Sequence, residues 1–427
     1  MKQKIAFVLC AVMLFPILLS VPSGAIQYPE ITHSDHFYVY SMDNDTVLYS
    51  KGATDRISPG PTVKLMTALL AIETFYNDLD REITVTKPML SGTYGNSIGL
   101  QADETVRAEW LINALIVGCA NDAASVLAHV ISGSLEGFVQ LMNRRAEELG
   151  ATHTHYTNPT GLDNENMYTT VEDIALLARY LGQYSLFTEI SAKSTYYMPA
   201  TNLSEERRIY NKNYLISTAM EYKYYSPSVT GMIAGNTPNA GYCVVATSEY
   251  SNSKYLCIVM GSTRDDTEYY NYTTTQELLN WAYSSYSYIT VLDESSIIAE
   301  VPVSMSAGID HVTLMPQNSV TLYLPSDIDV GAEIRRTWKL DADSLDAPVE
   351  AGQKVGTLSL IYQGKEIAQV DLVTKSAVER SKWLYAKAML AAVFAPSWFV
   401  PFCIALGCVI FIMILRRARE NGRNTRR

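Results

Sequence analysis

The chain has 427 residues, of which 48% are hydrophobic and 18% are charged, and its formal net charge is −11. A chain of this length and hydrophobic content can fill more than one core, so we expect two domains with additional segments. The excess of acidic residues argues against binding to nucleic acid, whose phosphates it would repel.

Residues 1–25 have the pattern of a secretory signal. Lys2 and Lys4 precede an apolar run over residues 5–19, and small residues lead up to Ala25. We expect cleavage near Ala25, which would export the bulk of the chain. A retained membrane anchor is the alternative interpretation of the same residues.

Residues 26–288 mix strand-like and helix-like patterns. Apolar and polar residues alternate around Asp43-Asn44-Asp45 in residues 36–50, which predicts a hairpin. Residues 62–75 are apolar around most of the helical circumference, which predicts a buried helix. The other expected elements are a helical block at about 107–130, helices at the capping boxes Thr169-x-x-Glu172 and Thr274-x-x-Glu277, and paired strands at 243–248 and 255–261. This mixture predicts an α+β domain.

The residue pattern of the sequence changes after about Tyr288. Residues 289–375 contain short β-rich runs, including 312–324 and 355–373, separated by Gly, Pro and Asp. This pattern predicts a separate small β domain. Residues 376–390 then form a juxtamembrane segment that leads into a long apolar stretch.

Residues 391–415 carry no charge and are long enough to cross a bilayer as one transmembrane helix. Pro396 and Pro401 interrupt the outer half, so we expect the firmest spanning portion to begin near Phe402. Six arginines in residues 416–427 favour a cytoplasmic tail. The sequence therefore predicts a single-pass protein of the cell membrane with its bulk outside the cell.

The cysteines do not indicate a disulfide framework. Three of the six lie in the expected signal and membrane segments. The other three are Cys119, Cys243 and Cys257. An odd number without metal-ligand spacing predicts neither paired disulfides nor a metal site.

A series of short motifs runs through both expected domains. They are Pro61-Thr62-Val63-Lys64, Asn96-Ser97-Ile98-Gly99-Leu100, Asn121-Asp122-Ala123-Ala124, Asn158-Pro159-Thr160-Gly161-Leu162-Asp163, Ala240-Gly241-Tyr242-Cys243 and Ala347-Pro348-Val349. In this order they resemble the penicillin-binding D-alanyl-D-alanine carboxypeptidases, whose S-x-x-K segment is read here through position 61. The resemblance implies an antiparallel sheet flanked by helices, as in β-lactamases and penicillin-binding proteins, and a β-sandwich-like C-terminal domain. It implies a cell-wall setting and no metal or organic cofactor.

Pro61 stands where the resemblance places the serine nucleophile, three residues before Lys64. In an active relative the serine lies at a helix N-terminus and the lysine one turn later takes its proton. Proline supplies no hydroxyl and no N–H, so the substitution also removes one oxyanion-hole donor, typically worth about 2.7 to 4 kcal/mol. Pro61 is nevertheless well suited to the first position of a helix.

The family's second motif, S-x-N, corresponds to Cys119-Ala120-Asn121. Asn121 can still bind a peptide carbonyl, whereas the Cys119 thiol is a weak substitute for the serine hydroxyl. Two interpretations of Cys119 stay open: a small buried residue that fills a serine-sized space, or a nucleophile activated near Lys64. Lys64 itself can be a structural cation hydrogen-bonded to Asn121.

The third motif, V-D-G-I-K-T-G in relatives, aligns without gaps with residues 229–235. Ile233 replaces the lysine and Ala234 replaces the threonine, which removes the cation and hydroxyl expected to hold the substrate's terminal carboxylate. Gly235 is retained at the substrate-binding position. The resemblance therefore implies loss of carboxylate recognition as well as loss of the nucleophile.

Two classes of function remain. The first is a membrane-anchored, catalytically inactive homologue of peptidoglycan metabolism that binds wall stem peptides or another cell-envelope protein. The second is an active serine-type or Cys119-dependent carboxypeptidase that trims stem peptides. The three altered motifs favour the first.

Overall fold

The computed structural model describes residues 26–394 and 399–424. Contacts within the chain define two compact units, one ending at Ser287 and the other beginning at Tyr288. The expected signal in residues 1–25, and Pro396 of the expected membrane segment, lie outside the described residues.

The first unit is built on a five-stranded antiparallel sheet with the strand order β2-β1-β9-β8-β7. The strands are β1 (His36–Ser41), β2 (Thr46–Lys51), β7 (Val229–Thr237), β8 (Gly241–Tyr250) and β9 (Ser253–Ser262). Strands β8 and β9 carry runs of consecutive buried residues, as expected where helices cover both faces of a sheet. The hairpin predicted for residues 36–50 and the two later paired strands are confirmed.

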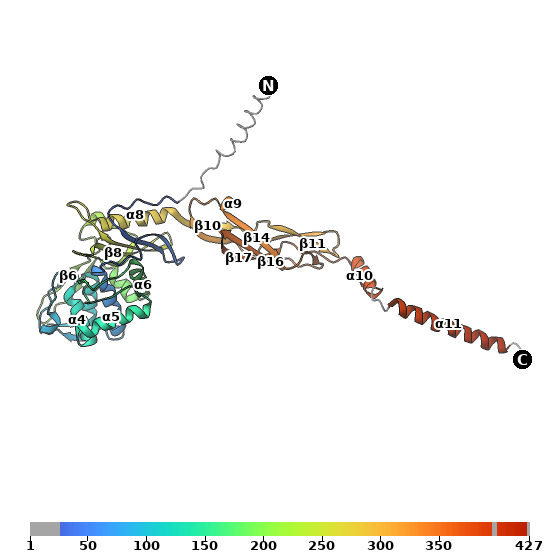
Figure 1. Cartoon of the computed structure of the whole chain (residues 1–427), viewed down its shortest axis with the longest axis horizontal. Helices are drawn as coiled ribbons and strands as arrows, with labels where there is room; N and C mark the ends of the chain where they lie inside the picture. The colour runs from blue at the N-terminus through green and yellow to red at the C-terminus, as the bar shows by residue number, and fades with distance from the viewer. Residues whose placement is uncertain (1–25, 395–398, 425–427) are drawn as a thin grey trace, which may run out of the picture. The chain divides into compact units, whose positions relative to one another are not determined.

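Helices cover both faces of this sheet (Figure 1). On one face α8 (Tyr270–Ser285) contacts β8 and β9, while α6 (Val171–Leu181) contacts β1 and β9 from the other. The other helices are α2 (Val63–Phe75), α3 (Ala108–Val117), α4 (Asn121–Ser132), α5 (Leu135–Leu149) and α7 (Ser185–Ser191). Two small hairpins, β3 (Glu82–Thr84) with β4 (Thr105–Arg107) and β5 (Thr195–Met198) with β6 (Arg207–Tyr210), complete the α+β fold.

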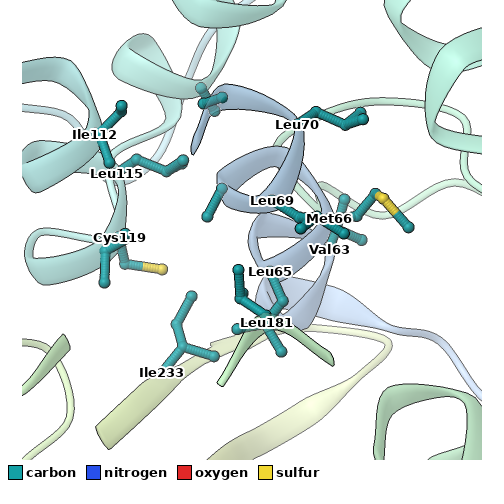
Figure 2. Close-up of a cluster of buried hydrophobic side chains, with 14 of the residues drawn as sticks. Val63, Leu65, Met66, Leu69, Leu70, Ile112, Leu115, Cys119, Leu181 and Ile233 are labelled. Atoms are coloured by element: carbon teal, nitrogen blue, oxygen red, sulfur yellow. The ribbon is translucent and has the colours of Figure 1, made fainter. Parts of the chain in front are cut away.

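Helix α2 lies in the middle of the hydrophobic core, as its apolar circumference predicts. Figure 2 shows its side chains facing Ile112 and Leu115 of α3 and Leu181 of α6. A short 3₁₀ turn, η2 (Gly60–Thr62), precedes the helix and contains Pro61. The core thus fixes the position of α2, and with it the position of the turn.

The helical block predicted at about 107–130 is two helices rather than one. Gly118 ends α3, and Cys119 adopts a left-handed backbone conformation with φ of +53°. This conformation is uncommon for a residue other than glycine and cannot continue a helix. The chain therefore turns at Cys119 before α4 begins at Asn121.

Both predicted capping boxes are wrong. Thr169 lies in an isolated β-bridge, and α6 is instead capped by Thr170, whose hydroxyl accepts a hydrogen bond from the Asp173 N–H. Helix α8 begins at Tyr270, so Thr274 lies inside it. The pattern located each helix but not the residue at which the backbone turns.

The second unit contains a six-stranded sheet with the order β14-β16-β17-β12-β11-β15, and β10 pairs with β13. The strands are β10 (Tyr286–Leu292), β11 (Ala299–Ser304), β12 (His311–Pro316), β13 (Val320–Pro325), β14 (Ile334–Leu340), β15 (Leu345–Asp346), β16 (Lys354–Tyr362) and β17 (Lys365–Thr374). Val301 and Leu314 belong to one buried cluster and Leu358 and Leu372 to another. The predicted C-terminal β domain is confirmed.

Two helices end the described chain, α10 (Lys382–Phe394) and α11 (Phe399–Asn424). Within α11, the stretch Phe399–Arg417 is long and apolar enough to cross a membrane. Pro401 falls in the first turn of α11, where a missing backbone N–H costs little. The helix can therefore include Pro401, and it begins at Phe399, before the expected Phe402.

Candidate functional site

A cavity of about 300 Å³ opens where η2, the start of α4 and β7 meet. Six of the seven residues that the sequence singled out line it, and the seventh, Ile233, does not. The six are Pro61, Lys64, Cys119, Asn121, Ala234 and Gly235. The fold therefore brings together motifs that are far apart in the sequence.

Pro61 is buried at the edge of the cavity. Its ring packs against Gly235 of β7, where an added Cβ would lie 2.8 Å from the Pro61 Cγ. The neighbouring Thr62 hydroxyl is committed to the local turn, because it donates a hydrogen bond of 2.7 Å to the Pro59 carbonyl. Neither residue offers the cavity a free hydroxyl.

Lys64 is 3% exposed, and its Nζ donates a hydrogen bond of 2.5 Å to the Thr160 carbonyl. Burial lowers the pKa of Lys64, while its charge interaction and hydrogen bond with Cys119 oppose that change. The expected partner, Asn121, is wrong: Lys64 bridges to the 158–163 motif and to the thiol instead. A buried amine beside a thiol is an arrangement that can move a proton.

Cys119 and Asn121 are held in place by Asn96. The Asn96 side-chain amide donates to the carbonyls of Gly118 and Cys119, and the Asn121 N–H donates to the Asn96 carbonyl at 2.8 Å. Asn121 Nδ2 donates to the Tyr94 carbonyl at 2.7 Å. Within the described parts of the chain, the buried Asn121 Oδ1 has no hydrogen-bond partner. This oxygen is available to a donor on a ligand.

The third motif is split between the cavity and the core. Ala234 and Gly235 line the cavity. Ile233 is buried in the hydrophobic cluster that also holds Leu65 and Leu181, as Figure 2 shows. The side chain at position 233 therefore packs in the core and does not bind a charged group.

Sequence reasoning missed one wall of the cavity, which is formed by a lysine and four tyrosines. They are Lys212, Tyr214, Tyr242, Tyr269 and Tyr272. The rings lie close together, with centroids 5.2 Å apart for Tyr214 and Tyr272. Tyr242 belongs to the motif Ala240-Gly241-Tyr242-Cys243. For the other three tyrosines the sequence offers only the abundance of tyrosine, 29 residues in all, which does not indicate which of them converge.

The described residues offer no metal site of the usual kind. Across 26–394 and 399–424, no group of three or more His, Cys, Asp or Glu side chains is placed to hold a metal ion. The side chains that line the cavity instead carry two amines, a thiol, amides and phenols. Such groups can bind a peptide-sized ligand and transfer protons.

Comparison with known proteins identifies both units. Residues 24–264 match the D-alanyl-D-alanine carboxypeptidase family, and residues 286–380 match the C-terminal domain of penicillin-binding protein 5. The chain is 28% identical over 350 residues to D-alanyl-D-alanine carboxypeptidase DacF of Bacillus subtilis, covering 80% of this chain and 85% of that one. It is 25% identical over 351 residues to DacC of Escherichia coli, covering 78% and 81%.

The fold is similar to those of solved structures. The carboxypeptidase DacD from Francisella tularensis superimposes with a TM-score of 0.60 at 20% identity, over 84% of this chain and 97% of that one. At this identity the likeness shows the fold, whereas the match of residues 24–264 covers more than half of the chain. The resemblance seen in the motifs is confirmed, and the chain belongs to the D-alanyl-D-alanine carboxypeptidase family.

Proposed function

We propose that this protein binds peptidoglycan stem peptides in the cavity without hydrolysing them. The observation that carries the proposal is Pro61, which stands at the nucleophile position and is packed against Gly235. A serine there would supply both the attacking hydroxyl and an N–H for the oxyanion, and proline supplies neither. The serine nucleophile is missing while a cavity of about 300 Å³ remains.

The carboxylate end of the cavity supports the same conclusion. Ala234 has no hydroxyl and Ile233 is turned into the core, so neither can hold the terminal carboxylate of a D-Ala-D-Ala peptide. The other polar side chains at the cavity include Asn121, the four tyrosines and Lys212. The amide and the phenols can hydrogen-bond peptide groups, and the Lys212 cation lies outside the family's third motif. Lys64, Cys119 and Asn121 are the residues to which we assign any residual chemistry, and Gly235 and Asn121 border the bound peptide.

We further propose a single-pass protein with six segments. These are a signal in residues 1–25, a carboxypeptidase-like domain in 26–288, a β domain in 289–375, a juxtamembrane segment in 376–390, a transmembrane helix in 391–415 and a cytoplasmic tail in 416–427. The apolar stretch Phe399–Arg417 and the arginines that follow it support this topology. The domains would then face the wall.

The test uses the full chain in detergent, with the Bacillus subtilis DacF relative as the active comparison. We expect no covalent adduct with labelled penicillin and no release of D-alanine from a D-Ala-D-Ala pentapeptide. The same peptide should bind, as measured by isothermal calorimetry. Ala234→Leu should weaken that binding at least tenfold by filling the cavity, whereas Ala332→Leu, at an exposed position of the second unit, should not.

Each result has a clear meaning. Stoichiometric acylation by penicillin would contradict the proposal, and so would an absence of peptide binding in the folded chain. Release of D-alanine that disappears in Cys119→Ala would establish the alternative, a Cys119-dependent carboxypeptidase.

A further inference from the structure

The strongest unexplained feature of the cavity is the meeting of a thiol and an amine. Lys64 comes from α2 and Cys119 from the turn between α3 and α4, and both line the cavity. Figure 2 shows the Cys119 side chain directed toward α2. The two groups interact through a hydrogen bond and through charge. A role in holding the fold does not require either group to reach the cavity.

Two features of the fold lie beside Cys119, the N-terminus of α4 and the buried amine of Lys64. Cys119 lies two residues before the start of α4, a helix of 12 residues whose N-terminus carries partial positive charge. Burial lowers the pKa of Lys64, so a neutral amine able to accept the thiol proton becomes more available. The left-handed backbone at Cys119 sets the direction in which its Cβ leaves the main chain.

The same cavity is poorly suited to attack on a carbonyl. Acyl transfer places negative charge on oxygen and needs donors to stabilise it, and Pro61 lacks the N–H at that position. Displacement at the sulfur of a disulfide creates no oxyanion, because the charge passes from one sulfur to another. A thiol chemistry is therefore compatible with Pro61 where an acyl chemistry is not.

We propose that Cys119 and Lys64 form a thiol-exchange site that captures small disulfides carrying an N–H group. Lys64 accepts the thiol proton, and the Cys119 sulfur attacks one sulfur of the ligand. A new S–S bond forms, the ligand's S–S bond breaks, and the departing thiolate takes the proton from Lys64. Cys119 is oxidised to a mixed disulfide, and half of the ligand leaves as the reduced thiol.

Two features define the ligand. Asn121 is 4% exposed and its Oδ1 lacks a partner in the described chain, so it can accept a hydrogen bond from an amine or amide on the ligand. Cys119 is only 5% exposed in a cavity of about 300 Å³, which restricts entry to small molecules. Cystamine satisfies both requirements and serves as the probe.

The experiment treats the full chain in detergent with cystamine and maps each cysteine by peptide mass spectrometry. We expect a mixed disulfide at Cys119, reversed by a reductant. Cys243 should stay free while the chain is folded, because burial raises its pKa to about 12. Cys257 is also buried with a raised pKa and gives a second internal control. A folded chain in which Cys119 remains unmodified overturns the proposal.

Variants test the two assigned roles. Lys64→Met should slow modification of Cys119 on the order of 10²-fold, while Lys87→Met, at an exposed site, should leave the rate unchanged. Asn121→Leu should abolish the preference for cystamine over dimethyl disulfide, which has no N–H. Equal rates in Lys64→Met and the unmodified protein would refute the role of Lys64.

Unfolding of Lys64→Met would be visible, because Cys243 and Cys257 would then be modified as well. Lys64→Arg replaces it in that case, since a guanidinium can still donate to the Thr160 carbonyl but cannot accept the thiol proton. An unchanged rate in that folded variant would equally overturn the proposal.

Discussion

Pro61 and Gly235 pack so closely that a Cβ added at Gly235 would lie 2.8 Å from the Pro61 Cγ and 3.0 Å from its Cβ. Real side chains do not approach at 2.8 Å, so the proline ring occupies the space that any larger residue at 235 would need. The ring is thus a packed part of the fold, at the position where we propose that the serine nucleophile has been replaced.

This contact predicts a specific coupling between the two positions. Gly235→Ala should destabilise the protein by about 1 to 3 kcal/mol through overpacking. In a Pro61→Ser background the added methyl meets a smaller side chain, so its cost should be lower. Denaturant unfolding of the two single variants and the double variant measures the difference. If Gly235→Ala lowered the free energy of unfolding equally in both backgrounds, the Pro61 ring would not be what limits the size of the residue at 235.

Much of the fold was predictable because its patterns are strong. The period-2 alternation around 43–45 and the apolar circumference of residues 62–75 each have one simple structural solution. The break at Cys119 was not predicted, although Gly118 and the polar pair Asn121-Asp122 interrupt the apolar pattern there. The left-handed backbone at Cys119 is accompanied by a hydrogen bond from Asn96 to its carbonyl, a contact between residues distant in sequence. Local patterns do not reveal such distant partners.

The site also contains residues that the sequence predicted and residues that it did not. The motifs predicted that Pro61, Lys64 and Cys119 would meet, because a resemblance carries three-dimensional information. The partner of Lys64 is Thr160, which lies 96 residues away, and three of the four wall tyrosines come from segments with no motif. Ile233 was expected at the site, yet the core takes its side chain. Whether such a side chain lies in the core or at the cavity is determined by packing in the folded protein.

We predict that Pro61→Ser by itself does not restore release of D-alanine. The serine would return a hydroxyl and an N–H, but Ala234 and Ile233 would still not hold the terminal carboxylate. Residues that act as a unit are strongly non-additive, so a variant that also carries Cys119→Ser and Ala234→Thr, both at positions that line the cavity, should exceed any single change. Turnover by Pro61→Ser near that of the DacF relative would contradict this argument.

Ile233→Lys should on its own be strongly destabilising. Ile233 is buried among Leu65 and Leu181, so a lysine there would place an unpaired charge in the core. We expect a loss of about 3 kcal/mol or more in the free energy of unfolding. The control, Ile233→Leu, keeps the volume and should cost less than about 1.5 kcal/mol. A lysine tolerated as well as leucine would mean that the side chain reaches the cavity after all.

A buried ion pair outside the cavity gives a further test. The Arg207 guanidinium contacts both Glu104 oxygens, at 2.7 and 3.0 Å, and Glu104 is fully buried. Arg207→Met should cost about 3 to 5 kcal/mol because it leaves an unpaired carboxylate, and adding Glu104→Gln should recover part of that loss. The exposed pair of Arg107 and Asp80 is the control, where Arg107→Met should cost no more than about 1 kcal/mol. Similar costs at the two pairs would contradict the prediction.

The buried amine of Lys64 should make stability depend on pH in a defined direction. Burial lowers the pKa of Lys64 in the folded chain below its ordinary value of 10.5. Between the folded-state pKa and 10.5 the unfolded chain therefore binds more protons, so the stability contributed by Lys64 rises with pH across that window. We therefore compare the free energy of unfolding of the protein with Lys64 and of Lys64→Met in denaturant. The difference in favour of Lys64 should be larger at pH 9.5 than at pH 7. Both proteins should carry Cys119→Ser, which removes titration of the thiol from the comparison. An advantage that stays constant or shrinks as the pH rises would show that Lys64 is charged in the folded chain over the whole range.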